Sequence, residues 1–301
     1  MEKYLLGIDL GGTNLRVAVV TSEGQLVEEI NVKTESEKGP YYVIDQMIQL
    51  CEKIMQEQNI AAIGIGSPGP LDVKKGLILS PNNLPGWDNI PLVDMLEKAL
   101  QKKVVLDNDA NAAALAEAII GAGKGKESVF YITVSTGVGG GFVFRKQLLQ
   151  GANFCAGEIG NLIVASDGPP HHALNVGSLE TLASGTAVKK RGIEQLGMTG
   201  HAGEVFALAM NGDIEAQKIV DQMITSLAKG IANIVHTVDP HIIVLGGAVM
   251  QSRDYIMPLL VERVNDFLYP QLRNKLEMVS ASLGTKAGVI GAALLTQQAA
   301  F

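Results

Sequence analysis

The sequence has few cysteines, no surplus of positive charge and no long apolar run. Only Cys51 and Cys155 occur among the 301 residues, so disulfides contribute little and we expect two reduced thiols. The net charge is −7, from 24 Lys and Arg against 31 Asp and Glu, which leaves no basic surplus for binding a nucleic acid. No apolar stretch approaches the roughly 20 residues of a membrane-spanning helix. We therefore expect neither a nucleic-acid nor a membrane partner.

The amino-terminal residues contain no recognisable export signal. The apolar run Tyr4–Ile8 is shorter than the hydrophobic region of a signal peptide, and Asp9 follows it. A cytoplasmic protein is the expectation. The length, with 47% hydrophobic and 18% charged residues, predicts a globular protein with room for two domains.

The N-terminal part alternates apolar stretches with turns. We predict strands at Tyr4–Leu10, Leu15–Thr21 and Gln25–Val32, a helix at Tyr42–Gln58, and a further strand at Ile60–Ile65. Three strands, a helix and a strand are typical of an α/β half-domain whose ligand loops lie at strand ends.

A similar order returns later in the chain. The patterns predict strands at Val129–Val134, Phe142–Arg145 and His241–Leu245, and helices at Leu179–Gln195, His201–Asn211 and Asp213–Val238. The return of a strand, a glycine-rich turn and a strand suggests a duplicated architecture. We place a smaller α/β domain at residues 1–108 and a larger one at residues 109–301, with the final helix free to pack back on the first domain.

Two glycine-rich turns are candidates for phosphate binding. In Asp9–Asn14 and in Ser135–Gly141, glycines after an apolar strand let backbone amides approach a phosphate closely. The first turn alone could be an ordinary hairpin, but the second holds more glycines than a plain turn requires. The second run fits neither a Walker loop nor a dinucleotide fingerprint. Asp9 would hold Mg²⁺ through water. Gly246-Gly247, after a later strand, could give a flat surface for a base or ribose, although such a pair is often only a turn.

Polar residues at Asp107–Asn111 precede an alanine-rich helix. One of them should serve as the helix N-cap, but three in succession, Asp107-Asn108-Asp109, exceed what a cap requires. A carboxylate at a helix N-terminus stays ionised near neutrality, which suits a base that accepts a hydroxyl proton. Asp109 is our candidate base. A pocket of carboxylates and amides with little positive charge would suit the vicinal hydroxyls of a sugar rather than an acidic substrate. The candidate residues of such a pocket are Asn83, Asn108, Asp109, Glu158 and Glu180.

Over essentially its whole length the chain resembles the repressor–open reading frame–kinase (ROK) family of bacterial sugar kinases and regulators. The matching stretches are Gly7–Arg16, Gly66–Pro70, Ser80–Trp87, Asp107–Glu117, Thr133–Gly141, Gly157–Gly160, Leu179-Glu180 and Val244–Gly247.

The resemblance implies a two-domain actin-like (ribonuclease H-like) α/β fold with a ligand cleft between the domains. It also implies a hexokinase-like reaction that uses ATP and Mg²⁺, and often a homodimer. By motif, Asp109 would be the base, and Asn108, Glu158 and Glu180 would contact the sugar. The residues expected at ATP and its phosphates are Asp9, Gly11, Gly12, Thr13, Asn14, Thr136, Gly137, Gly139, Gly140, Gly246 and Gly247.

One departure from the family pattern concerns zinc. Family members usually have a His where this chain has Asn161, followed by a cysteine-rich segment whose positions here hold His171, Ala173 and Ser178. Because a structural zinc site needs four N or S ligands, we predict no structural zinc. Asn161 can still exchange hydrogen bonds with a sugar hydroxyl, so we keep it as a candidate contact.

The leading functional hypothesis is an ATP-dependent hexose kinase acting on a primary hydroxyl, with glucose as the first candidate acceptor. Fructose, mannose, N-acetylmannosamine, N-acetylglucosamine and glucosides remain open as acceptors. A sugar-responsive transcription regulator would carry a helix-turn-helix before the first glycine turn, which begins within ten residues of Met1. A non-catalytic sugar sensor would need Asp109 or a glycine turn to be degraded, and both are intact.

Overall fold

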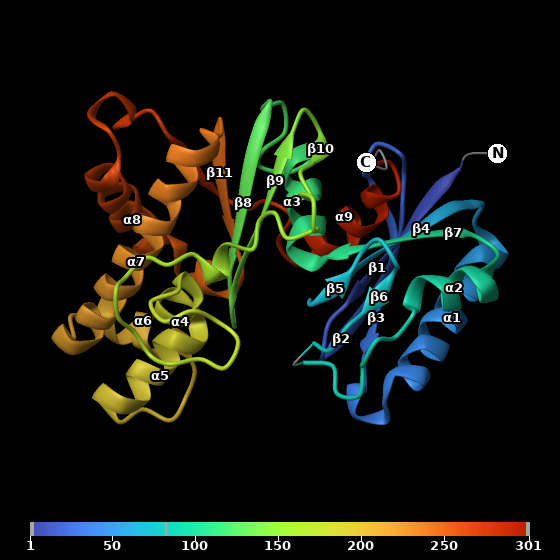
Figure 1. The fold of residues 1–301 in the computed structure, drawn as a ribbon, viewed down its shortest axis with the longest axis horizontal. Helices are drawn as coiled ribbons and strands as arrows, with labels where there is room; N and C mark the ends of the chain where they lie inside the picture. Colours follow the sequence, from blue (N-terminus) through green and yellow to red (C-terminus); the bar gives the residue numbers. More distant parts are fainter. Residues whose placement is uncertain (1–2, 82, 299–301) are drawn as a thin grey trace. The chain divides into compact units, whose positions relative to one another are not determined.

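The computed structural model describes residues 3–81 and 83–298, which form a mixed α/β structure (Figure 1). The strands are β1 (Tyr4–Leu10), β2 (Asn14–Val20), β3 (Leu26–Lys33), β4 (Ile60–Ser67), β5 (Leu71–Asp72), β6 (Leu77–Ile78), β7 (Lys103–Asn108), β8 (Ser128–Val134), β9 (Val138–Phe144), β10 (Gln147–Leu148), β11 (Ile242–Gly246) and β12 (Glu277–Ser280). The α-helices are α1 (Pro40–Glu57), α2 (Leu92–Leu100), α3 (Asp109–Ile119), α4 (Leu179–Ala183), α5 (Gly185–Leu196), α6 (Ala202–Met210), α7 (Ile214–Val238), α8 (Arg253–Phe267) and α9 (Ala287–Leu295).

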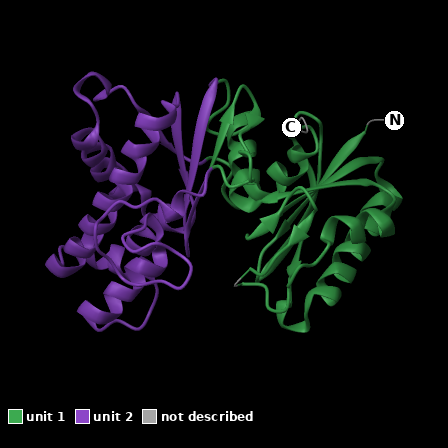
Figure 2. Ribbon diagram, viewed as in Figure 1, with its two compact units in different colours: residues 1–125, 141–156, 282–301 green, residues 126–140, 157–281 purple. Residues whose placement is uncertain are grey.

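The chain divides into two compact units, coloured separately in Figure 2. Unit 1 comprises residues 1–125, 141–156 and 282–301, and unit 2 comprises residues 126–140 and 157–281. Compact units defined by packing are not necessarily domains that fold independently. The domain boundary expected between residues 108 and 109 therefore stays a prediction.

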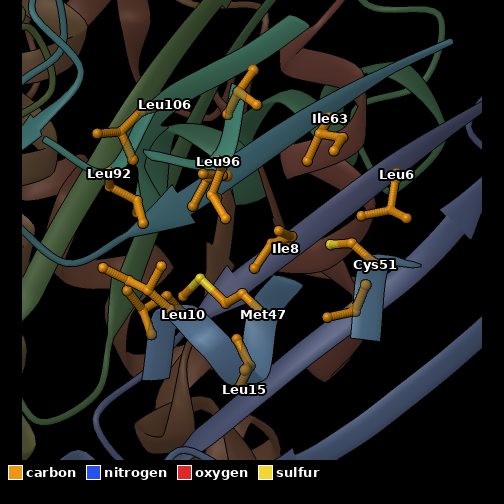
Figure 3. Packing of buried hydrophobic residues seen from close by; sticks show 14 of the residues in the cluster. Leu6, Ile8, Leu10, Leu15, Met47, Cys51, Ile63, Leu92, Leu96 and Leu106 are labelled. Atoms are coloured by element: carbon orange, nitrogen blue, oxygen red, sulfur yellow. The ribbon is translucent and has the colours of Figure 1, made fainter. Parts of the chain in front are cut away.

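Unit 1 is built on a five-stranded sheet of order β3-β2-β1-β4-β7. β1, β4 and β7 run parallel, and β2 is antiparallel to β1 and β3. Alternate side chains of a strand point to opposite faces, so Leu6, Ile8 and Leu10 of β1 lie together in the core against Met47 of α1 (Figure 3). Because β1, β4 and β7 are parallel, their carboxyl ends lie at the same edge of this sheet.

The other face of the sheet packs against α9, which comes from the end of the chain. A Cβ on Gly7 of β1 would lie 2.0 Å from the carbonyl oxygen of Val289, and one on Gly64 of β4 would lie 1.8 Å from that of Ala292. Such distances are shorter than any real Cβ contact, so only glycine permits the helix to lie this close to the strands. Segments near the two ends of the chain, β1 and α9, thus pack directly against each other.

Unit 2 contains the parallel strands β8, β11 and β12 and the helices α4 to α8. The sheet has the order β10-β9-β8-β11-β12, and the unit boundary falls within β9, between Gly140 and Gly141. The long helix α7 begins after Asp213, whose carboxylate accepts a hydrogen bond from the Ala216 N–H at 2.8 Å. That N-cap satisfies one of the otherwise unpaired amides of the first turn.

Two predicted elements differ from the structure. The single helix expected at Leu179–Gln195 is wrong, because Ser184 ends α4 and its hydroxyl caps α5 by accepting from the Ala187 N–H at 3.1 Å. The strand expected at Phe142–Arg145 begins earlier, at Val138, so most of the glycine run lies inside β9. The turn itself is confined to Ser135–Gly137.

Candidate functional site

The candidate residues of unit 1 gather at the carboxyl edge of its parallel strands. Asp9 of β1 is in register with Gly66 of β4, and Gly66 is in register with Asp107 of β7. Asn108 then ends β7 and caps α3, because its Oδ1 accepts a hydrogen bond from the Ala110 N–H at 2.8 Å. Edges of this kind, where parallel strands end, are the usual ligand-binding positions of α/β sheets.

Asp9 forms an ion pair across the first hairpin. Nη1 of Arg16 donates to its Oδ2 at 3.1 Å, and the same nitrogen donates to the Thr285 carbonyl at 3.3 Å. Burial raises the pKa of Asp9 to about 6; the Arg16 guanidinium opposes this rise, and the nearby charge of Asp109 adds to it. The Asp9 side chain keeps 18% of its surface exposed, so a hydrated ion can approach it. A Mg²⁺ ion held through water fits this partly neutralised carboxylate.

The first glycine turn accepts hydrogen bonds from residues of the segment that follows β3. The Thr34 hydroxyl donates to the Gly11 carbonyl at 2.6 Å, and the Ser36 hydroxyl donates to the Gly12 carbonyl at 3.0 Å. A Cβ on Gly12 would lie 2.5 Å from the Asn83 carbonyl oxygen, so Asn83 lies directly against the turn. Because its carbonyls are already bonded, the turn is fixed in one conformation before any ligand arrives.

The candidate base Asp109 is the first residue of α3. Its carboxylate accepts from the Ala110 N–H at 2.8 Å, and its side chain keeps solvent-accessible surface although protein atoms surround it closely. Desolvation by these atoms raises the pKa of Asp109, and the backbone hydrogen bonds oppose that rise. A raised pKa brings a carboxylate closer to the proton affinity that a general base needs.

Asp107 lies buried behind this residue and organises its surroundings. Its carboxylate accepts from the Asn108 N–H at 2.7 Å, from Asn111 Nδ2 at 2.8 Å and from Gln150 Nε2 at 2.6 Å. Burial raises the pKa of Asp107, and the hydrogen bonds from Asn111 and Gln150 act against that rise. In the Asp-Asn-Asp run, Asp107 thus anchors the neighbouring side chains, Asn108 caps α3, and the side chain of Asp109 remains exposed.

In unit 2, the second glycine turn follows β8. Thr136 is exposed, and its carbonyl accepts a hydrogen bond from the Thr186 hydroxyl at 2.7 Å. Gly139 and Gly140 do not lie in this turn as the glycine run suggested, because both belong to β9, and Gly140 is buried against Phe130 and Ile159. Of the residues predicted to bind phosphate in this run, Thr136 and Gly137 lie in the turn itself.

Glu180 joins two of the predicted segments of unit 2. Its Oε2 accepts from the Val138 N–H at 2.8 Å, and a Cβ on Gly137 or on Gly160 would lie 2.4 Å or 3.2 Å from the same oxygen. The carboxylate thus lies between the glycine turn and the Gly157–Asn161 segment. Glu158 of that segment is exposed.

Two cavities in unit 2 lie beside this turn, and Thr136 and Thr186 line both. The larger cavity, of about 430 Å³, is also lined by Ser135, Gly185, Lys189, His201, Ala202, Gly203, Phe206, Ala248, Val249, Gln251 and Ser252. The smaller cavity, of about 280 Å³, is also lined by Gly137, Pro169, Pro170, His171, Leu174, Glu180, Thr181, Ser184, Ala187 and Lys190.

Strand β11 ends at Gly246, and Gly247 leads directly into Ala248 and Val249, which line the larger cavity. Gly247 has a φ of 91°, and a Cβ on it would lie 2.3 Å from the Val134 carbonyl oxygen. A glycine is required there, which lets the chain turn sharply into the residues that line the cavity. Sequence reasoning missed Lys189, His201 and Gln251 of this cavity, because they lie far apart in the chain and no local pattern connects them.

The structure thus collects the predicted residues in two groups. Asp9, the first glycine turn, Asn83, Asn108 and Asp109 belong to unit 1, whereas Thr136, Gly137, Glu158, Asn161, Glu180 and Gly246-Gly247 belong to unit 2. Within residues 3–81 and 83–298, no three His, Cys, Asp or Glu side chains form a group that could hold a metal ion. In the same part of the chain, no helix has the length and apolarity needed to cross a membrane.

Comparison with known proteins gives consistent matches over nearly the whole chain. The family model described as "ROK family" matches residues 5–299. A glucokinase of Thermotoga maritima is 32% identical, over 98% of this chain and 97% of its own length. An N-acetylmannosamine kinase of Escherichia coli is 34% identical, over 97% of this chain and 98% of its own length.

Solved structures agree with this assignment. The ROK hexokinase of Thermus thermophilus has a TM-score of 0.90 and 36% identity, with 97% of each chain covered. A ROK glucokinase of Streptomyces griseus, in complex with glucose and AMPPNP, has a TM-score of 0.80 and 29% identity, over 97% of this chain and 98% of that one. The two-domain actin-like ATPase fold and the enzyme class expected from the sequence, an ATP-dependent sugar kinase, are confirmed. This chain belongs to the ROK family.

Proposed function

We propose that this protein transfers the γ-phosphoryl group of ATP to the primary hydroxyl of glucose, forming glucose 6-phosphate and ADP. The observation that carries the proposal is the position of Thr136, a residue of the second glycine turn that lines both cavities. The larger cavity has the size and the largely apolar lining of a nucleoside site. The smaller one contains Glu180, which suits a hydroxyl-rich acceptor.

Each candidate residue has a chemical task in this reaction. Asp109 accepts the proton of the sugar hydroxyl as its oxygen attacks the γ-phosphorus and the bond to the ADP oxygen breaks. Asn83, Asn108, Glu158, Asn161 and Glu180 orient the sugar. Amides of the two glycine turns, at Gly11, Gly12, Thr13 and Asn14 and at Thr136 and Gly137, contact the phosphates. Asp9 is the residue that would hold Mg²⁺, which supplies positive charge against the phosphate oxygens.

The similarity to glucokinases supports glucose as acceptor, and the AMPPNP in the Streptomyces griseus structure supports ATP as donor. The similarity to N-acetylmannosamine kinases favours a second candidate acceptor, N-acetylmannosamine. We further propose a homodimer, as the family resemblance implies, and a location in the cytoplasm, as expected from the sequence.

A coupled assay of ADP release tests the proposal. The purified protein is given ATP, Mg²⁺ and, separately, glucose, mannose, fructose, N-acetylmannosamine, N-acetylglucosamine and a methyl glucoside. We expect the highest kcat/KM with glucose. A higher kcat/KM with another sugar would make that sugar, and not glucose, the preferred acceptor. No turnover with any sugar would overturn the kinase assignment for this protein.

A further inference from the structure

The segment between Asn161 and Ser178 forms part of the lining of the smaller cavity. It contributes Pro169, Pro170, His171 and Leu174 to the lining, next to Glu180 on α4. Among residues 165–177 only Gly177 is buried. A segment this exposed gains little from apolar burial, so the hydrogen bonds of its backbone decide whether it has one conformation.

Three successive backbone amides of this segment donate to side chains. The N–H groups of Ala173 and Leu174 both donate to Nδ1 of His171, at 3.2 Å each. The next N–H group, that of Asn175, donates to Oδ1 of Asn161 at 2.8 Å. One imidazole and one carboxamide therefore organise the part of the segment that faces the cavity.

The base of the segment is closed by the backbone itself. The Val164 and Ala165 N–H groups donate to the Gly177 carbonyl at 2.9 and 3.3 Å, and the Leu179 N–H donates to the Leu162 carbonyl at 2.8 Å. Gly177 has a φ of 72°, and a Cβ there would lie 2.0 Å from the Ala165 carbonyl oxygen. The two ends are thus fixed together, and His171 with Asn161 fixes the tip.

We propose that His171 and Asn161 are positioning residues that hold segment 165–177 as the wall of the acceptor cavity, a task that needs no metal ion. Because Nδ1 of His171 accepts two N–H bonds, the neutral ring carries its proton on Nε2. The wall places Leu174 and the two prolines beside Glu180, so its conformation determines how well a sugar fits there. The link to the sugar rests on the proposed function, whereas the conformation of the wall does not.

The experiment compares His171→Ala and His171→Asn with the wild type. Asparagine readily accepts from backbone N–H groups two or three residues ahead, so it should replace Nδ1 in this role. His172→Ala is the matched control, because the His172 ring lies 4.4 Å from that of His171 and the neighbouring change removes a similar exposed side chain.

Hydrogen–deuterium exchange of peptides that contain residues 173–175 is the first readout. We expect His171→Ala to speed exchange about tenfold, and His171→Asn and His172→Ala to leave it within about twofold of the wild type. Asn161→Ala should speed exchange at Asn175, while Asn161→Asp, which keeps an acceptor oxygen, should not. Equal exchange in His171→Ala and His172→Ala would overturn the proposal.

Kinetics and metal content supply the second readout. His171→Ala should raise the KM for the sugar about fivefold to tenfold, because the two bonds that hold the wall are lost, and should leave the KM for ATP within about twofold. The wild-type protein should hold less than about one zinc per ten chains, and a chelator should not change the exchange pattern. One tightly bound zinc per chain, whose removal speeds exchange at residues 173–175, would overturn the metal-free wall. If no sugar is turned over, the proposed function fails, and the exchange data still decide the claim about the wall.

Discussion

Glu180 accepts a hydrogen bond from the Val138 N–H at 2.8 Å, and Gly137 faces the same carboxylate oxygen so closely that a Cβ would lie 2.4 Å from it. A residue expected to bind sugar therefore also fixes the turn expected to bind phosphate. In the proposed function, both substrates would therefore depend on the carboxylate of Glu180. A side chain at residue 137 would therefore have to displace the Glu180 carboxylate from the Val138 N–H.

Gly137→Ala and Glu180→Ala test this coupling. Each change should lower kcat/KM for the sugar about 30-fold or more, because Gly137→Ala pushes the turn and the Glu180 carboxylate apart and Glu180→Ala removes that carboxylate. The double variant should be about as active as the worse single variant, because the methyl group added at residue 137 no longer meets a carboxylate. Strictly multiplicative losses in the double-mutant cycle would show that the two residues act independently.

Two neighbouring lysines of α5 test the assignment of the two cavities. Lys189 lines the larger cavity and Lys190 lines the smaller one. We expect Lys189→Met to raise the KM for ATP about tenfold with little effect on the sugar, and Lys190→Met to raise only the KM for the sugar. Steady-state kinetics with each substrate varied in turn checks this. The opposite pattern would mean that the larger cavity binds the sugar and the smaller one binds ATP.

The pH dependence of activity should report the ionisation of Asp109, together with that of Asp9, whose pKa burial raises to about 6. A base works only when it is ionised, and burial raises the pKa of Asp109 above its ordinary value of 3.8. We therefore expect kcat/KM for the sugar to fall, as pH is lowered, at a pH above the usual aspartate range. An activity that stays flat down to pH 4 in a protein that remains folded would contradict this assignment.

The same shift makes Asp109 a cost to stability. Because its folded pKa is raised, the unfolded chain releases the proton at lower pH, and the free energy of unfolding decreases as pH rises from below 3.8 through the folded pKa. Asp109→Asn should therefore raise the melting temperature at pH 8, and the gain should disappear near pH 3.5. Thermal unfolding of both proteins across this range measures it, and a gain independent of pH would refute the explanation.

Glu117 of α3 should be important for stability rather than for chemistry. Its buried carboxylate accepts from the Ala122, Ser282 and Leu283 N–H groups and from the Ser282 hydroxyl. Glu117→Gln presents an amide to these donors and should lower the free energy of unfolding by about 3 kcal/mol.

Glu215→Gln is the matched control for Glu117. It breaks an exposed pair with Lys218 on α7 and should cost less than about 1 kcal/mol. Urea unfolding of the two variants measures the two losses in the free energy of unfolding. Equal losses would mean that the Glu117 hydrogen bonds add no more than a surface pair does.

Local patterns predicted much of the fold. Strand β1 has the predicted bounds Tyr4–Leu10, because its apolar residues continue until a carboxylate and two glycines end them. Asp213 marks the start of α7 because it is a strong N-cap. The break at Ser184 was missed, since apolar spacing alone does not distinguish one helix from two consecutive helices capped by a serine.

Candidate residues that are neighbours in the sequence could be predicted, whereas those that only the fold brings together could not. Asp107–Asp109 could be recognised because the run exceeds what a cap requires. The bond between Arg16 and Asp9 depends on hairpin register, and the cavity residues Lys189 and His201 meet only through the packing of α5 and α6. The placement of Gly139 and Gly140 in β9 could not be inferred from composition, because a glycine run is read as a turn unless a partner strand pairs with it.

The central claim is that Asp109 is the base of an ATP-dependent hexose kinase, and Asp109→Asn tests it most directly. Asparagine keeps the size of the side chain and its hydrogen bond to the Ala110 N–H but cannot accept a proton. With glucose and saturating MgATP, we predict a loss in kcat of at least about 1,000-fold, with the KM for ATP within about threefold of the wild type. An Asp109→Asn variant that keeps full turnover would contradict the account.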